Sequence, residues 1–413
     1  MRLLQKLASV LKAVFSTGSY RGGLLSLPAT SSAGVTISEH AALSLSTVWA
    51  CVRAISDPIG FLPLHVYRRT RNGRERAVTH PAYRLLHDSP DGLMTACEWR
   101  SSMQAHVLTH GNAFSRILWA SGTNRVIGLE LLHPTQVSLE ELPDGGYRYV
   151  VATKRGRIVI EPADMLHIRG PSPDCRWGYS VIALAREAIG LAAAMEQYGA
   201  QFFRWGGRTP YVLEHPGGFR TAEELEAFRQ RWREAYHSAE AWHQALILTG
   251  GMKYQSIGIT PEDAQFLASR QFQVTEICRW FRVSPHLVAD LSRATFSNIE
   301  HLGIEFLTQT LAYWLKLWEQ QINLKLLGQE FYAEFDVNAL VRGDYASRTR
   351  GYATLLQNGV LSVNEVRELE NRNPVDGGDA HHIQLNMQPL TNARPARAGG
   401  SNAGNSISQN GNE

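Results

Sequence analysis

The chain has 413 residues, of which 44% are hydrophobic and 19% are charged, with a formal net charge of +3 at pH 7. This composition suits two or three domains with buried cores, and it excludes a disordered or fibrous protein. The near-neutral charge argues against a protein that grips nucleic acid through many phosphate contacts, but it is compatible with DNA that slides past.

Residues 1–40 are predicted to form a flexible N-terminal arm, because glycine, proline and serine interrupt them from Gly22 onward. The first residues mix leucines with lysines, and the charges break the apolar run before it reaches the length of a signal peptide core or a membrane span. We expect a short amphipathic segment and no membrane partner. Binding to a membrane surface is the alternative.

The four cysteines, Cys51, Cys97, Cys175 and Cys278, lie far apart in the sequence, so they form no CxxC pair of the kind that holds zinc. We interpret them as small buried apolar side chains. They require no disulfide, and we expect folding in a reducing cytoplasm with no metal and no cofactor.

Residues 43–57 are predicted to form a helix, and residues 60–170 are predicted to be mainly strands, because short runs of alternating apolar and polar residues recur along the latter. Gly145, in the string Asp-Gly-Gly, marks the turn of a hairpin. One helix interrupts the strands. Thr95 and Glu98 have the spacing of a capping box at its start, and it ends near Gly111.

The most regular segment covers residues 179–209, where apolar residues recur at alternating steps of three and four. This spacing predicts a long helix over 180–205 with a narrow apolar stripe, which suits packing against copies of the same helix. A core helix of one compact domain is the alternative. The stripe consists of Val181, Leu184, Ala188, Leu191, Met195, Tyr198 and Phe202.

A small α/β insertion is predicted over residues 210–258, around a helix that begins at a Thr221–Glu224 capping box. A second long helix follows within residues 259–290, with Pro261 in its first turn.

The remaining chain is predicted to be mainly helical. Residues 291–298 form a polar loop, and residues 299–343 form a long helix followed by one strand that returns to the sheet. Two short helices occupy residues 344–370 and are separated at Asn358-Gly359. Residues 391–413 are rich in Asn, Ser, Gly and Ala, which predicts a disordered tail. The sequence as a whole predicts an α+β fold.

A search for catalytic motifs returns none. The chain has no P-loop, no dinucleotide-binding glycine fingerprint, no HExxH and no GxSxG string, so a nucleotide-driven motor or a hydrolase of these kinds is not expected. Glu330, Glu334, Asp336 and Asp344 could be imagined as a two-metal nuclease centre. A solvated strand face and a helix cap explain these carboxylates more simply.

Two further patterns have a possible chemistry and a simpler explanation. Adjacent histidines at 381 and 382 could ligate a metal, but two ligands do not make a site. Aromatic and basic residues interleave at the end of the stripe helix, as in some proteins that bind single-stranded nucleic acid, although packing with a cationic rim is the simpler interpretation. These residues are Phe202, Phe203, Arg204, Trp205 and Arg208.

Several strings occur in a fixed order along residues 40–390, and the ordered set resembles the portal protein family of long-tailed, double-stranded DNA phages. The strings are HGNAF (110–114), LLHPTQVSLE (131–140), DMLHIRG (164–170), WGYSVIALAREAI (177–189), ITPEDAQFLASRQF (259–272), ATFSNIE (294–300) and NGVLSVNEVRELENRNPVDGGD (358–379).

The resemblance implies a portal fold and a division of the chain into named parts. These are a β-rich wing (41–178, completed by 299–343), two stem helices (179–209 and 259–290), a clip (210–258), a tunnel loop (291–298) and a helical crown (344–390).

The resemblance also implies function and partners. Family members form rings, generally of twelve subunits, at one vertex of the virion capsid, and they act as the channel for packaging and ejection of double-stranded DNA. They are not enzymes. The implied partners are DNA, bound transiently and without sequence preference, the terminase large subunit, a head-completion or adaptor protein, and the major capsid and scaffold proteins. Assembly is expected in the host cytoplasm.

The polar loop resembles the tunnel loop that faces DNA in the family. Its only charged residue is Arg293, so few counterions would be released and contact with DNA is expected to be weak. The loop residues are Ser292, Arg293, Ala294, Thr295, Phe296, Ser297 and Asn298.

Two other classes of protein remain as alternatives. One is a structural protein of the tail or baseplate. The other, less favoured, is a phage nuclease or hydrolase, which would need a convergent set of acid, base or metal-binding groups that the motif search does not provide.

Overall fold

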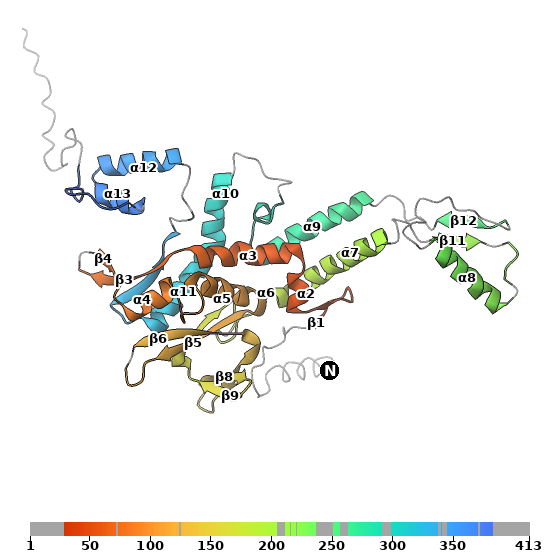
Figure 1. Ribbon diagram of the computed structural model, residues 1–413, viewed down its shortest axis with the longest axis horizontal. Helices are drawn as coiled ribbons and strands as arrows, with labels where there is room; N and C mark the ends of the chain where they lie inside the picture. The colour runs from red at the N-terminus through yellow and green to blue at the C-terminus, as the bar shows by residue number, and fades with distance from the viewer. Residues whose placement is uncertain are drawn as a thin grey trace, which may run out of the picture. The chain divides into compact units, whose positions relative to one another are not determined.

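The computed structural model describes residues 29–382, apart from 72, 124, 205–210, 215, 220, 237–250, 257–262, 291–298, 338, 339, 341–344 and 371. Helices and sheets are mixed along the chain, in agreement with the predicted α+β class (Figure 1). All strand pairs within these ranges are antiparallel. The chain divides into two compact units, Met1–Val341 and Arg342–Glu413.

The core of the first unit lies between helices α3 (Ser46–Phe61) and α5 (Ala96–His110), which pack closely against each other. Helix α11 (Ala312–Leu326) adds to this core, because its buried Trp318 meets the buried Trp99 of α5 edge-on, with ring centroids 5.6 Å apart. The large buried rings explain why helices distant in sequence share one core.

Two local signals in the sequence are confirmed. The Thr95 hydroxyl accepts a hydrogen bond from the Glu98 N–H at 3.2 Å, and the Glu98 carboxylate accepts one from the Thr95 N–H at 2.8 Å, which completes the capping box of α5. The predicted hairpin joins β7 (Val137–Glu141) to β8 (Tyr147–Thr153). Its turn contains Gly145 at φ 83°, which glycine adopts without steric cost.

Three three-stranded sheets occur in the described part of the first unit. The predicted returning strand is confirmed, because β13 pairs with β3 and so closes a sheet begun far earlier in the chain. The first sheet contains β13 (Phe331–Phe335), β3 (Leu64–Thr70) and β4 (Gly73–Arg76). The second sheet contains β10 (Met165–Arg169), β5 (Asn112–Trp119) and β6 (Val126–Leu132). The third sheet contains β7, β8 and β9 (Gly156–Ile160).

Short helical segments connect several of these elements. They are α4 (Pro81–His87), η1 (Pro134–Gln136), η2 (Pro162–Asp164) and η4 (Pro285–Val288), and each begins with proline, whose fixed φ suits the first turn of a helix.

The prediction that residues 29–40 belong to a flexible arm is wrong. They form a small hairpin and a helix, namely β1 (Ala29–Thr30), β2 (Thr36–Ile37) and α2 (Glu39–Leu43). Ile37 is fully buried, and the Ser32 N–H donates to the Glu187 carboxylate at 2.9 Å. The serines and glycine that suggested flexibility make a tight turn here. Residues 1–28 lie outside the described residues.

The helix predicted over 180–205 is interrupted once, at Ala185. It consists of α6 (Val181–Leu184) and α7 (Arg186–Arg204). Ala185 has ψ 8°, which is not helical, but its N–H still donates to the Val181 carbonyl at 2.8 Å and its carbonyl accepts from the Ile189 N–H at 2.9 Å. The hydrogen-bond ladder therefore runs through the interruption.

The second predicted long helix is α9 (Asp263–Phe281). The helix predicted to follow the polar loop has an irregular middle, because a π-helical stretch, η6 (Leu307–Leu311), separates α10 (Ile299–Phe306) from α11. Within this stretch the buried Thr310 hydroxyl donates to the Arg282 carbonyl at 2.5 Å. In the wider π turn, a polar side chain can form a hydrogen bond with a group outside the helix. The apolar periodicity of the sequence alone gives no sign of such a turn.

The predicted α/β insertion contains β11 (Tyr211–Glu214), α8 (Ala222–Tyr236) and β12 (Lys253–Ser256), and β11 pairs with β12. In the second unit, the two predicted short helices are α12 (Tyr345–Gln357) and α13 (Val363–Leu369). The predicted disordered tail lies outside the described residues. Every described helix is too short or too polar to cross a lipid bilayer.

Arg100 ties three helices together from inside the core. Its side chain is only 3% exposed, and the guanidinium donates to four backbone carbonyls at 2.6 to 3.1 Å. The carbonyls belong to Ile59, Gly60, Leu62 and Leu86. Three of them lie at the C-terminal end of α3, where helical carbonyls lack partners. Burial lowers the pKa of Arg100 to about 10, so it stays charged at neutral pH.

We expect Arg100→Lys to destabilise the protein by about 2–4 kcal/mol, because an ammonium cannot reach four carbonyls arranged for a planar fork. Urea unfolding followed by circular dichroism measures the loss. The matched control is Arg53→Lys on α3, where the arginine is exposed and pairs with Asp57, and it should change stability by less than about 0.5 kcal/mol. Equal effects of the two substitutions would contradict this role of Arg100.

Candidate functional site

The predicted site consists of the stripe helix and the polar loop, and the structure shows how the stripe helix begins. The Ser180 hydroxyl donates to the Thr109 carbonyl at the end of α5 and accepts from the Ala183 N–H at 3.0 Å. It therefore caps α6 and fastens it to α5 at the same time. Ile182 and Ile189 are fully buried, so this end of the helix belongs to the core.

A junction of backbone and side-chain groups fixes the approach to this helix. The buried Asn112 donates to the Gly178 carbonyl at 3.0 Å and accepts from the Gly178 N–H at 2.8 Å. Gly111 has φ 78°, and a Cβ atom there would lie 2.3 Å from the Gly178 carbonyl oxygen. The Gly170 N–H donates to the Gly111 carbonyl at 2.8 Å. Only glycines allow these backbones to approach so closely.

His167 completes the junction and is fully buried. Its Nε2 lies 3.0 Å from Asn112 Oδ1, and its Nδ1 lies 3.0 Å from the Tyr149 hydroxyl. Because Asn112 Oδ1 can only accept, Nε2 carries the proton and Nδ1 accepts from the tyrosine. Burial holds the pKa of His167 well below its usual value, so the ring is neutral.

The far halves of α7 and α9 lie side by side beyond this core (Figure 1). Glu196 of α7 and Arg270 of α9 form an ion pair at 3.3 Å. Nearer the core, the buried thiols of Cys51 and Cys278 lie 3.8 Å apart and are both free. The contact with Cys278, together with burial, raises the pKa of Cys51. The helix pair is thus fixed at one end and exposed at the other.

The stripe residues divide into two sets. Leu184, Leu191 and Tyr198 are 39%, 42% and 60% exposed. Their spacing of seven residues is close to two helical turns, so they lie along one side. The other set, Val181, Ala188 and Met195, is half-buried, and Met195 lines a shallow groove against α9. The side chain of Phe202 lies outside the described residues.

Sequence reasoning missed two exposed aromatic residues on α9. Phe272 and Trp280 are 55% and 41% exposed, and Phe272 faces the groove beside Leu191 and Met195. The sequence did contain a sign of them, because both aromatic residues lie at positions of α9 that do not share the helix face packed against the core. Together with the exposed set on α6 and α7, they give the helix pair an apolar surface that the single subunit leaves open.

All of the predicted loop, Ser292 to Asn298, lies outside the described residues. Its approach is described: η4 ends at Ala289, whose φ of 64° is left-handed, and the Asp290 N–H donates to the Pro285 carbonyl at 3.1 Å. The chain therefore makes a tight turn immediately before the loop.

The other candidate chemistries find little support among the described residues. Glu334 forms an ion pair with Arg74, and Glu330 lies 3.6 Å from Arg68, so these carboxylates serve strand-to-strand pairing in the β13–β3–β4 sheet. Asp344, Trp205, Arg208 and the side chains at 202–204 lie outside the described residues.

Comparison with known proteins gives consistent findings. The family model "Phage portal protein" matches residues 46–371. A probable portal protein of Streptomyces phage phiC31 is 33% identical over 386 residues, which cover 89% of this chain and 84% of that protein. The portal protein of Enterobacteria phage HK97 is 31% identical over 365 residues, covering 86% and 85%. A solved structure described as the neck of a native gene transfer agent particle, computed with C12 symmetry, has TM-score 0.57 and 18% identity, and covers 89% and 99%.

We expect the stability of the protein to fall as pH drops below about 6.5, because unfolded histidine binds a proton there and folded His167 does not. His65, whose pKa burial lowers to about 4, adds to the effect. His167→Gln should reduce the slope of stability against pH by about 1.4 kcal/mol per pH unit. Urea unfolding at several pH values measures it. An unchanged slope would show that His167 is not a buried neutral ring.

Proposed function

Because this chain belongs to the phage portal protein family, we propose that its copies form the ring at one capsid vertex through which double-stranded DNA is packaged and ejected. The exposed apolar surface of the helix pair α7 and α9 supports the proposal most directly. An exposed apolar surface of this kind indicates that another protein surface covers it, and in a ring that surface belongs to a neighbouring copy.

A closed ring requires that one surface patch meet a different patch on the next copy. The seam on α6 and α7, with Leu184, Leu191 and Tyr198, is one such patch. Phe272 of α9 lines the same groove as Leu191 and so belongs to this patch. We propose the opposite flank of the helix pair as the second patch. We propose twelve subunits, in keeping with the C12 symmetry given for the gene transfer agent neck, whose fold is similar.

We assign the parts of the fold by the same proposal. Residues 41–178 with the returning strand form the wing, the helix pair forms the stem, residues 210–258 form the clip and residues 344–390 form the crown. The clip would dock the terminase large subunit during packaging and a head-completion or adaptor protein afterwards. The major capsid and scaffold proteins would surround the ring in the virion.

Family membership favours the portal function over the alternatives that the sequence left open. The portal family is structural and not enzymatic, so a nuclease or hydrolase activity is not proposed. The matching family model describes a phage portal protein, not a protein of the tail or baseplate, so the tail or baseplate alternative is not proposed either.

We expect Leu191→Glu to weaken ring assembly, because the carboxylate would be buried at the seam between neighbouring stems without a partner. Size-exclusion chromatography with light scattering should show a shift from a ring near twelve subunits toward small species, with unchanged thermal unfolding of the subunit. Leu324→Glu is the matched control, because Leu324 is a 72% exposed leucine on α11, away from the seam. Intact rings of Leu191→Glu, or equal loss in the control, would argue against this interface.

We expect Arg293→Glu to lower the yield of packaged DNA while the ring stays assembled, because the substitution places a negative charge where the loop is proposed to face phosphates. Packaging is measured as nuclease-protected DNA in an in vitro reaction, with ring mass as the control for assembly. Arg293→Lys should retain most of the yield. Full packaging by Arg293→Glu would remove the proposed role of the loop.

A further inference from the structure

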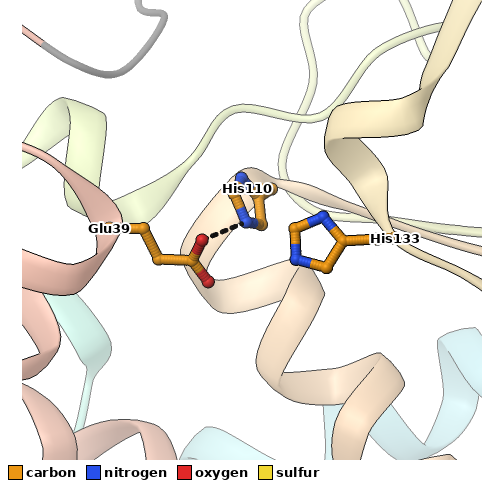
Figure 2. A group of neighbouring side chains, drawn as sticks. All are labelled: Glu39, His110 and His133. Atoms are coloured by element: carbon orange, nitrogen blue, oxygen red, sulfur yellow. Dashed lines mark ion pairs between the residues drawn. The ribbon is translucent and has the colours of Figure 1, made fainter.

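Three side chains from distant parts of the sequence meet beside the junction. Glu39 begins α2, His110 ends α5, and His133 directly precedes η1. Their possible ligand atoms all lie within 4.8 Å of one another. In Figure 2 the carboxylate of Glu39 points toward the two imidazole rings, and an ion pair connects it to His110.

We propose that Glu39, His110 and His133 bind one divalent transition-metal ion of the zinc class, with water in the remaining position. Two imidazole nitrogens and one carboxylate form the donor set that zinc accepts in open tetrahedral sites. Calcium and magnesium prefer sets made of oxygen alone, so this group selects against them.

The spacing of the donor atoms suits such an ion. Glu39 Oε2 lies 3.0 Å from His110 Nε2, close to the distance of about 3.3 Å between two ligands bound tetrahedrally at roughly 2.0 Å. The same Nε2 is buried and has no partner with good hydrogen-bond geometry among the described residues. The ion pair alone therefore leaves this nitrogen poorly satisfied, and a bound cation would satisfy both groups.

The neighbouring Thr135 holds the ring of His133 in place. His133 Nδ1 accepts a hydrogen bond from the Thr135 N–H at 3.4 Å and lies 2.8 Å from the Thr135 hydroxyl. When a metal binds at Nε2, Nδ1 would carry the proton and donate it to that hydroxyl instead. The ring of His106 lies 5.0 Å from that of His133, and its buried Nδ1 has no hydrogen-bond partner among the described residues.

The proposed metal site does not depend on assembly of the subunits into an oligomeric ring, because all three ligands belong to one subunit. Its effect would be to clamp α2 and η1 onto the end of α5, next to Gly111.

The test uses the full chain, stripped with a chelator and titrated with ZnCl2 by calorimetry. We expect one ion per subunit and a rise in the thermal unfolding temperature, and Co2+ in place of Zn2+ should give the visible absorption of a tetrahedral site. Glu39→Gln and His133→Gln should each weaken Zn2+ binding by at least about tenfold. Glu39→Gln keeps the side-chain shape, so it decides the matter if a histidine variant fails to fold.

Two controls separate this site from adventitious binding by other histidines. His40→Gln alters the exposed neighbour of Glu39 on α2, and a double substitution of His381 and His382 by Gln removes an exposed pair elsewhere. Both should bind Zn2+ as the unaltered chain does. The proposal is overturned if the unaltered chain binds no zinc, if Glu39→Gln and His133→Gln bind it equally well, or if only the double substitution abolishes binding.

Discussion

The hydrogen bonds between Asn112 and Gly178 fix the position from which the stripe helix leaves the core. One side-chain amide satisfies both the N–H and the carbonyl of a buried backbone residue. Without these bonds, each unpaired buried group would lower the free energy of unfolding by roughly 1–3 kcal/mol. Because Asn112 begins β5 and Gly178 precedes α6, these bonds set where the stripe helix starts relative to the sheet. The neutral ring of His167 holds the amide in that orientation.

This junction also gives physical meaning to the strings on which the family resemblance rests. HGNAF, DMLHIRG and WGYSVIALAREAI are distant in sequence, yet each supplies a part of the same contact: Gly111 and Asn112 from the first, His167 and Gly170 from the second, Gly178 and Ser180 from the third. The glycines are required by the close approach of two backbones and the histidine by burial without charge. The three strings therefore supply the residues of one junction in the folded chain.

What the sequence could predict follows from the range of the interactions involved. The box of Thr95 and Glu98 and the turn at Gly145 act over a few residues, and both were predictable. The order in residues 29–40 depends on Glu187, and the π turn depends on the Arg282 carbonyl, so neither has a local signal. Apolar spacing predicted the stripe helix, but only packing against α9 separates exposed Leu191 from half-buried Met195. Glu39, His110 and His133 could not be grouped from sequence, because no spacing connects them.

Ring assembly requires rigid, directional bonds inside each subunit but contacts between subunits that tolerate small shifts. Closure of a ring with the proposed twelve copies would require each to turn by roughly 30° relative to the last, and a small error in the angle between its two patches would accumulate around the ring. Apolar contacts such as those proposed for Leu191 tolerate small shifts, since burial has little directional preference. The angle must therefore be fixed within the subunit, by directional bonds. Arg100 fixes α3 to α4 and α5. Ser180 fixes the start of α6 to α5, and Asn112 fixes the residue Gly178 before it to β5. These buried polar groups supply the precision that apolar contacts between subunits lack.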